Sequence, residues 1–398
     1  MSVLAADRAA VVLDEPCSPP AKLTQRLLSL DVYRGVIMVA LISFGFGLRA
    51  LKDDPRWSFL ARQVDHRQWT GVVFWDLVQP AFMFMVGVAM PFAFARRRSM
   101  GATRQQLLWH TLRRALGLIV LGILITCITD GKISIEFRRV LQQIAVGYVI
   151  SFFLLERGYL AQFIVAASIL ILYTLAWIIY AHHTGTDPWA TGDANMGGAF
   201  ERLVFRHNSS GHYVSLNAIP ATATILYGVI CGQLVGSNLT KKRVMIYLAI
   251  FTATTIAAGL VLSLWVPIIK RIWTASFSLY SGGIVILALL VFYWMIEVMN
   301  WRRGWTFFIV VGMNSIFAYA MTEIFRGTFN RWILIFSRPL FTWLLDRPHA
   351  WEALQKPASA PWPPQLGTWG DVIQAILVLL AQWGVLYFLY RRRIFFKL

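Results

Sequence analysis

A histidine and an aspartate ten residues apart are the side chains of this chain best suited to acid–base chemistry. His66 lies in a polar segment that leads into a membrane-length apolar run, and Asp76 lies inside that run. Histidine titrates near neutral pH, so at this position it can accept the proton of a nucleophile or carry an acyl group covalently. A solvated loop histidine beside Asp65 and Arg67 is the other interpretation, so the prediction that His66 is catalytic depends also on the motif His66-x-x-Trp69-x-Gly71. Both catalytic roles stay open.

Pro80 gives Asp76 an unusual setting. A proline removes the backbone hydrogen bond to residue i−4, and here that residue is Asp76. An ionisable side chain and an unsatisfied carbonyl are both costly in hydrocarbon, so this helix face is expected to line protein or a wet cavity. Asn217, three residues before Pro220, repeats the arrangement. We predict that Asp76 belongs to the active site, where it holds an acceptor or orients a partner group.

The composition indicates the class of protein that positions these groups. Of 398 residues, 58% are hydrophobic and 14% are charged, and the mean hydropathy is +0.60. Apolar runs of membrane length recur along the chain, which is typical of an all-α polytopic membrane protein. The net charge of +18 comes from basic residues gathered in short loops, a pattern that orients membrane helices and does not indicate a nucleic-acid partner.

Ten transmembrane helices are expected in a single domain, residues 27–398, behind a disordered cytoplasmic tail, residues 1–26. They are predicted at 30–48, 72–95, 115–128, 140–155, 160–180, 216–235, 244–266, 275–298, 306–325 and 372–390. The six arginines of residues 96–114 are then in a loop, and the apolar run 332–345 is too interrupted to span. Lysine and arginine are denser in the loops on one side of the membrane, and such loops are usually cytoplasmic. This places both termini in the cytoplasm and His66 outside.

Other polar residues in or near the apolar runs also need an explanation. Interhelical hydrogen bonds account for asparagine and serine in membranes, whereas an acid such as Glu323 indicates function. Trp69 suits either stacking on a sugar ring or anchoring at the membrane interface. Asp31 and Arg34 are three residues apart and can pair on one helix face. The histidines and the three cysteines show no metal or disulfide spacing, so we assign no metal.

Three segments around His66 resemble one known family. They are His66-x-x-Trp69-x-Gly71, Asp76-Leu77-Val78-x-Pro80 and Met85-Val86-Gly87. They are similar to those of the heparan-alpha-glucosaminide N-acetyltransferase family, membrane enzymes that acylate a sugar amine. Further matches follow in chain order at Ser29-Leu30-Asp31-x-x-Arg34-Gly35, Val140-Leu141-Gln142, Asn217-x-Ile219, Trp273-Thr274-x-Ser276-Phe277, Gly312-Met313-Asn314-Ser315-Ile316, Glu323 and Arg393-Ile394-Phe395-x-Lys397. The resemblance thus covers nearly the whole core.

The resemblance implies a function and a set of site residues. It implies a membrane acyltransferase that moves an acyl group, expected to be acetyl, from cytoplasmic acyl-CoA to an amine or hydroxyl of an extracytoplasmic sugar or glycan. The implied acyl-CoA-binding residues are Asp31, Arg34, Arg114 and Asn314. The implied acceptor-binding residues are Ser43, Trp69, Asn217, Lys270, Trp273 and Glu323.

Two departures from the family pattern are visible. Ser43 stands where the animal enzymes have an asparagine near the outer end of the first helix. The family's Arg-Ile-Pro-Gly is replaced by Glu136-Phe137-Arg138-Arg139. The chain looks more similar to bacterial members, so we expect it in the inner membrane of a bacterium. A second copy of the chain is a candidate partner beside the lipid bilayer.

Two other classes of protein remain as alternatives. An ion-coupled secondary transporter of a small solute would also use broken helices and buried acids such as Asp76 and Glu323. Release of free coenzyme A separates the two, because only an acyltransferase consumes the thioester. A non-catalytic membrane partner would predict that His66→Ala changes nothing.

Overall fold

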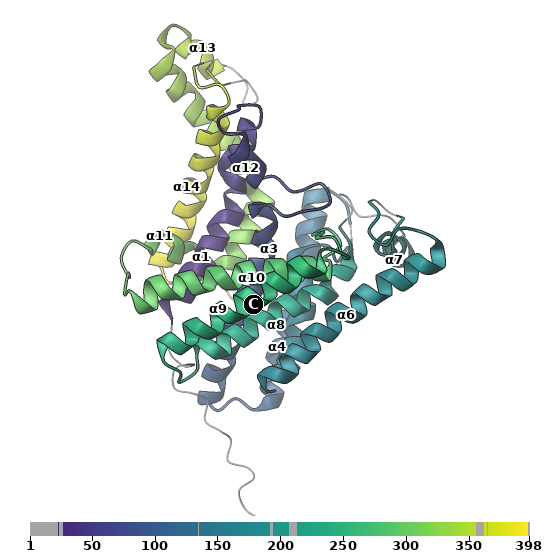
Figure 1. The fold of residues 1–398 in the computed structure, drawn as a ribbon. Coiled ribbons are helices and arrows are strands. Elements are labelled where there is room, and N and C mark those ends of the chain that lie inside the picture. Colours follow the sequence, from purple (N-terminus) through teal and green to yellow (C-terminus); the bar gives the residue numbers. More distant parts are fainter. Residues whose placement is uncertain are drawn as a thin grey trace, which may run out of the picture.

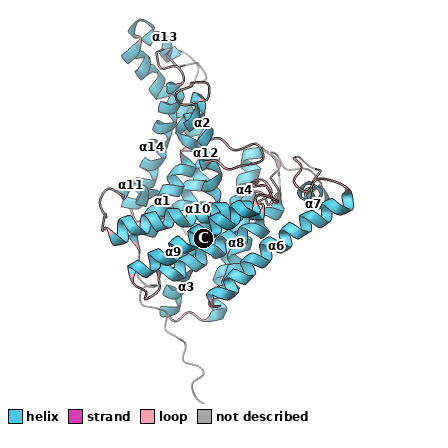
Figure 2. Ribbon diagram, in the orientation of Figure 1, coloured by secondary structure: helices cyan, strands magenta, loops and turns pink. Residues whose placement is uncertain are grey.

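The computed structural model describes residues 23, 27–133, 135–191, 194–206, 213–355, 362–363 and 365–396. The tail predicted over residues 1–26 lies outside this part except for Leu23, and Lys397 lies outside it as well. Every regular element in the described part is a helix (Figures 1 and 2). One isolated bridge joins Thr70 to Ile269. The predicted all-α class is confirmed.

Seven helices of the described chain are long and apolar enough to cross a membrane. They are α3 (Phe74–Ser99), α4 (Arg104–Asp130), α6 (Tyr159–Thr184), α8 (Ala218–Val235), α9 (Lys241–Leu262), α10 (Ala275–Tyr293) and α14 (Trp369–Arg391). Two bent pairs raise the number to nine, namely α1 (Leu28–Ile42) with η2 (Phe44–Leu51) and α11 (Thr306–Met313) with α12 (Ser315–Leu345). The chain is a polytopic membrane protein, but the predicted number of ten spans is not confirmed. The cytoplasmic placement of both termini stays a prediction.

The remaining helices are short. The described part also contains α2 (Ser58–Gln63), α5 (Val140–Leu154), α7 (Met196–Phe205) and α13 (Ala350–Gln355). The α5 helix is apolar but has only 15 residues. It occupies the position of the fourth predicted span.

Two helix boundaries predicted from hydropathy are wrong. The arginines assigned to a loop over 96–114 lie at the end of α3 and in α4, which are joined only by residues 100–103. The apolar run 332–345 is the second half of α12, which does not end at residue 325. Hydropathy locates only the apolar part of a helix. The start of α4 contains arginine, glutamine and leucine, which favour helix although two of them are polar.

Two membrane helices break where the backbone departs from helical geometry. After α1, residues Gly45, Phe46 and Gly47 have φ values of 72°, 55° and 70°, and the two parts meet at 47°. Glycine adopts such angles without steric cost. The helices α11 and α12 meet at 81° around Asn314. The break gives the Asn314 amide access to another segment of the chain.

The helix that carries Asp76 is fixed by close packing. In Figure 1, α8 lies among the membrane helices, and it is buried along almost its whole length. The helices α3 and α8 touch through their backbones, because a side chain at Gly87 would overlap the Ile225 carbonyl, and one at Gly228 would overlap the Phe84 carbonyl. Small residues allow such close approach in membranes. The start of α3 therefore has a fixed position against the core.

Candidate active site

Asp76 lies in the first turn of α3 and is 1% exposed. Its Oδ2 accepts the backbone N–H of Val73 at 3.2 Å and that of Arg67 at 3.5 Å. A carboxylate is favoured at this end of a helix, where backbone N–H groups have no helical partner. These bonds fix the side chain and leave Oδ1 for other groups.

His66 lies in the loop between α2 and α3, and its Nδ1 is 2.7 Å from Asp76 Oδ1. An ionised carboxylate only accepts hydrogen bonds, so Nδ1 carries the proton and donates it. Nε2 then holds the lone pair of a neutral imidazole. The structure thus brings the two residues predicted to be catalytic into direct contact.

Lys270 completes this group. It lies between α9 and α10, and its Nζ is 3.5 Å from Asp76 Oδ1 and 3.2 Å from His66 Nδ1. An antiparallel main-chain bridge holds the loops together: it pairs Thr70 with Ile269 and includes a 2.9 Å hydrogen bond from the Gly71 N–H to the Ile268 carbonyl. Lys270, one of the residues implied to bind the acceptor, therefore forms a cluster with Asp76 and His66, the Asp76–His66–Lys270 cluster.

The environment of the cluster lowers the pKa of both basic groups. Burial lowers the pKa of His66 below 6.5, the hydrogen bond to Asp76 opposes this shift, and the charge of Lys270 adds to it. Burial also lowers the pKa of Lys270 to about 8, against the opposing effect of Asp76. At neutral pH His66 is mainly neutral, which is the form whose Nε2 can accept a proton.

Replacing Lys270 with methionine is expected to move the acid limb of the pH–rate profile to higher pH. The ammonium disfavours the imidazolium, so its removal raises the pKa of His66. Activity that requires neutral His66 then appears only at higher pH. The measurement is kcat/KM against pH, which reports the groups of the free enzyme.

Lys242→Met is the matched control for this experiment, because Lys242 is exposed at the start of α9. Its acid limb should coincide with that of the wild type. An acid limb that stays in place or moves to lower pH in Lys270→Met contradicts the prediction.

A cavity of about 420 Å³ lies beside the cluster. Its lining includes three predicted site residues, His66, Lys270 and Glu323. It also includes residues that were not predicted to belong to the site, namely Trp75, Gln79, Arg138, Arg139, Tyr213 and Tyr319. Arg138 and Arg139 could have been noticed in the sequence, because they belong to the segment Glu136-Phe137-Arg138-Arg139 that departs from the family pattern.

The polar side chains from α12 and from the segment before α5 form a second group in this cavity. Arg139 Nη1 is 2.7 Å from Glu323 Oε2. The other Arg139 nitrogens donate to the hydroxyls of Thr126 and Thr129, at 2.7 Å and 2.6 Å. Glu323 is thus an acid with a fixed cationic partner in the same cavity as His66.

Two predicted acceptor residues shape the loops around Lys270 but do not line the cavity. Trp69 Nε1 donates to the Trp189 carbonyl at 2.8 Å. Asn217 Nδ2 donates to the Arg271 carbonyl, also at 2.8 Å, next to Lys270 in the chain. Trp69 and Asn217 therefore support the loops that hold Lys270 and are not placed to touch a ligand in the cavity.

The contacts of Trp273 and Ser43 do not support a role in binding the acceptor. Trp273 is fully buried and packs edge-on against Phe277. Ser43 is buried and its hydroxyl donates to the Ala40 carbonyl at 2.8 Å. Neither residue lines the cavity, so the structure does not bring them to His66.

The residues implied to bind acyl-CoA also lie outside this lining. Arg34 Nη2 is 2.9 Å from Asp31 Oδ1, so the pairing predicted from their spacing is present. Arg114 lies over the Tyr148 ring and donates to its hydroxyl at 3.3 Å. The structure does not gather these three residues around His66.

Asn314 has a structural partner at the break between α11 and α12. Its Nδ2 donates to the Ile394 carbonyl, and its Oδ1 accepts the Phe396 N–H, both at 3.0 Å. The ring of Phe396 also stacks on Phe317. The side-chain amide of Asn314 therefore holds the C-terminal segment, a contact that the sequence did not predict.

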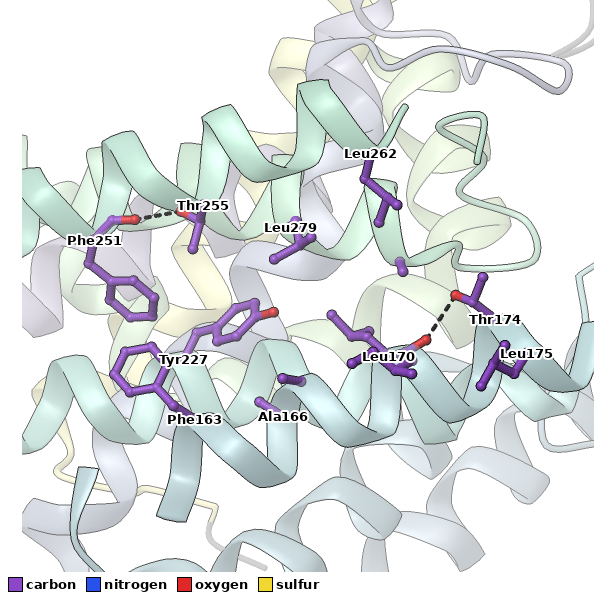
Figure 3. A pocket seen from close by; sticks show the side chains of 13 residues that line it. Phe163, Ala166, Leu170, Thr174, Leu175, Tyr227, Phe251, Thr255, Leu262 and Leu279 are labelled. Carbon is purple, nitrogen blue, oxygen red and sulfur yellow. Dashed lines mark hydrogen bonds between the residues drawn. The ribbon is translucent and has the colours of Figure 1, made fainter. Parts of the chain in front are cut away.

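A second cavity, of about 340 Å³, has a different character. Figure 3 shows that it lies between helices and is lined mainly by apolar groups, such as Phe163, Leu170 and Phe251. The hydroxyls of its two threonines donate to backbone carbonyls of their own helices. It offers no group that titrates near neutral pH, so acid–base chemistry is assigned to the cavity beside His66.

Comparisons with known proteins agree with the resemblance. The family model for "Heparan-alpha-glucosaminide N-acetyltransferase, catalytic" matches residues 26–263, which include His66 and Asp76. The heparan-alpha-glucosaminide N-acetyltransferase of Homo sapiens is 25% identical over 444 aligned positions, and that of Mus musculus is 23% identical over 440. Each alignment covers 94% of this chain and 60% of the relative, so the chain spans about 60% of their length. Because the family model matches more than half of the chain, the chain belongs to the heparan-alpha-glucosaminide N-acetyltransferase family.

Proposed function

We propose that the chain is a membrane acetyltransferase that moves an acetyl group from acetyl-coenzyme A to an amine or hydroxyl of an extracytoplasmic sugar. The observation that carries the proposal is the 2.7 Å contact between His66 Nδ1 and Asp76 Oδ1 beside a cavity. This contact prepares Nε2 to accept a proton or an acyl group. The names of the two relatives support a sugar amine as the acceptor.

In the direct route, His66 is the general base. The acceptor nitrogen or oxygen attacks the thioester carbonyl carbon while Nε2 takes the acceptor's proton. The carbon–sulfur bond breaks, and the leaving thiolate takes this proton from the imidazolium. Asp76 stabilises the imidazolium through Nδ1, and the Lys270 ammonium can stabilise the negative charge on the carbonyl oxygen.

In the carrier route, Nε2 attacks the thioester carbonyl carbon and the thiolate leaves. The acetylated ring carries a positive charge, which Asp76 balances through the Nδ1–H. The acceptor then attacks the acetyl carbon, its proton goes to the thiolate, and His66 is released in its neutral form. Both routes use His66 and Asp76.

Isotope-labelled acetyl-coenzyme A, offered to the purified protein with a panel of amino sugars and neutral sugars, tests the proposal. We expect labelled sugar and an equal amount of free coenzyme A. Labelled donor alone separates the routes, since label that binds the wild type and not His66→Ala indicates the carrier. A protein that labels no sugar and releases no thiol would contradict the proposal and favour a transporter or a non-catalytic partner.

Replacing Arg34 with alanine is expected to weaken the binding of coenzyme A by about tenfold, because a guanidinium binds phosphate through two parallel hydrogen bonds. The Arg34 side chain is 32% exposed, so it can reach a ligand while it contacts Asp31. The measurement is the Kd of coenzyme A, with Arg331→Ala, at an exposed arginine of α12, as the control. An unchanged Kd in a folded Arg34→Ala protein removes Arg34 from the donor site.

A further inference from the structure

We infer that the cavity beside His66 receives a second, uncharged unit of the sugar acceptor, and that Glu323 and Arg139 recognise the hydroxyl groups of this unit. The inference rests on the proposed transfer to a sugar. It concerns the polar group on the cavity wall that the acid–base chemistry of His66 does not use.

The geometry leaves part of Glu323 open to a ligand. Arg139 holds Oε2 at 2.7 Å, and two threonine hydroxyls hold the other nitrogens of this guanidinium. Glu323 Oε1 accepts no hydrogen bond from another described residue, although 22% of the side chain is exposed. Glu323 therefore keeps one carboxylate oxygen without a donor among the described residues, on a side chain that lines the same cavity as His66.

This pair suits sugar hydroxyl groups. A hydroxyl donates one hydrogen bond and accepts others, so it can donate to a carboxylate while it accepts from a guanidinium. The rings of Trp75 and Tyr319 supply apolar surface in the same cavity. A volume of about 420 Å³ lies within the range of small-molecule sites, roughly 300 to 1,000 Å³. The cavity can therefore hold more of the acceptor than its reactive group.

The charges of the cavity favour an uncharged unit. Its three permanently or mostly charged cations already contact carboxylates: Arg138 contacts Asp130 and Glu136, Arg139 contacts Glu323, and Lys270 contacts Asp76. A carboxylate on the acceptor would have to displace one of these acids. It would also lie near Glu323 Oε1, and like charges in an interface are unfavourable.

Two disaccharides with the same reactive end test the inference, namely glucosamine linked to glucose and glucosamine linked to glucuronate. For the wild-type protein we expect kcat/KM to be at least about tenfold higher with the neutral disaccharide, since a like charge costs more than 1.4 kcal/mol at close range. Glu323→Gln keeps the shape and removes the charge. It should remove or reverse the preference, because the repulsion is lost and Arg139 is left without its carboxylate partner.

The control is Glu352→Gln on α13, where the carboxylate is exposed and does not line the cavity. It should keep the wild-type ratio. Equal use of both disaccharides by the wild type overturns the inference, and this comparison needs no variant to fold. An unchanged ratio in folded Glu323→Gln protein also overturns it.

Binding measured without transfer separates this inference from the proposed function. The N-acetylated forms of both disaccharides cannot accept a second acetyl group on nitrogen, and Trp75 in the cavity wall provides a fluorescence signal. Tighter binding of the neutral form supports the subsite, even in a protein that acetylates neither disaccharide, a result that would reject only the transfer. Equal binding of the two forms overturns the subsite.

Discussion

Alanine at position 66 is expected to lower the rate of acetyl transfer by about 100-fold to 10,000-fold, the usual contribution of a general base. Asparagine should fail as well, because its amide can contact Asp76 but has no atom that can take up the acceptor's proton. The side chain of His66 is 37% exposed and lies in a loop, so its removal should leave the fold intact. The measurement is kcat with acetyl-coenzyme A and a sugar amine.

His183→Ala is the matched control, because His183 is an exposed histidine at the end of α6. It should retain the wild-type kcat, and all three variants should retain the wild-type Tm. A wild-type rate in folded His66→Ala protein would reject both the base and the carrier.

Replacing Asp76 with asparagine should lower kcat by about 100-fold or more, since the ring of His66 loses the group that selects its tautomer. The new amide can donate to Nδ1, which would leave the proton on Nε2 and remove the basic atom. The buried Lys270 ammonium would also lose its carboxylate partner, and a buried charge without its partner typically costs about 3–5 kcal/mol of stability.

A double variant separates these two effects. Asp76→Asn combined with Lys270→Met removes both charges, so it should recover much of the lost Tm while kcat stays low. The measurement is kcat and Tm for the single and the double variants. Recovery of both quantities together would show that Asp76 acts on stability and does not orient His66.

The local sequence indicated His66 and Asp76 as candidates, the motif of the family supported His66, and their catalytic roles stay predictions. Both residues belong to one short segment at the start of a membrane helix, where an acid and a histidine ten residues apart can meet across the helix entry. Lys270 lies 204 residues from His66, and its contact depends on the pairing of two loops. The partnership between Arg139 and Glu323 joins residues 184 positions apart. Such contacts have no local signature. The resemblance indicated Lys270, whereas Glu323 was indicated both by the resemblance and by its place as an acid near an apolar run.

Hydropathy located the apolar parts of the helices but not their ends and breaks. The helix α4 begins in a basic segment, and α12 continues past Arg326 and Arg331, where average polarity suggests a loop. The bend at Asn314 depends on a contact with the C-terminal segment. Tertiary contacts decide these features, and a window of neighbouring residues does not contain them.

The main-chain contacts between the two loops of the site have a consequence for evolution. The bridge from Thr70 to Ile269 and the bond from Gly71 to the Ile268 carbonyl use backbone atoms, so most substitutions at these positions leave the register of the loops unchanged. Gly71 is different, because its φ of 100° is strained for any other residue. Homologues that share a quarter of their residues can therefore vary the other side chains of both loops and still present Lys270 to His66, provided that Gly71 persists.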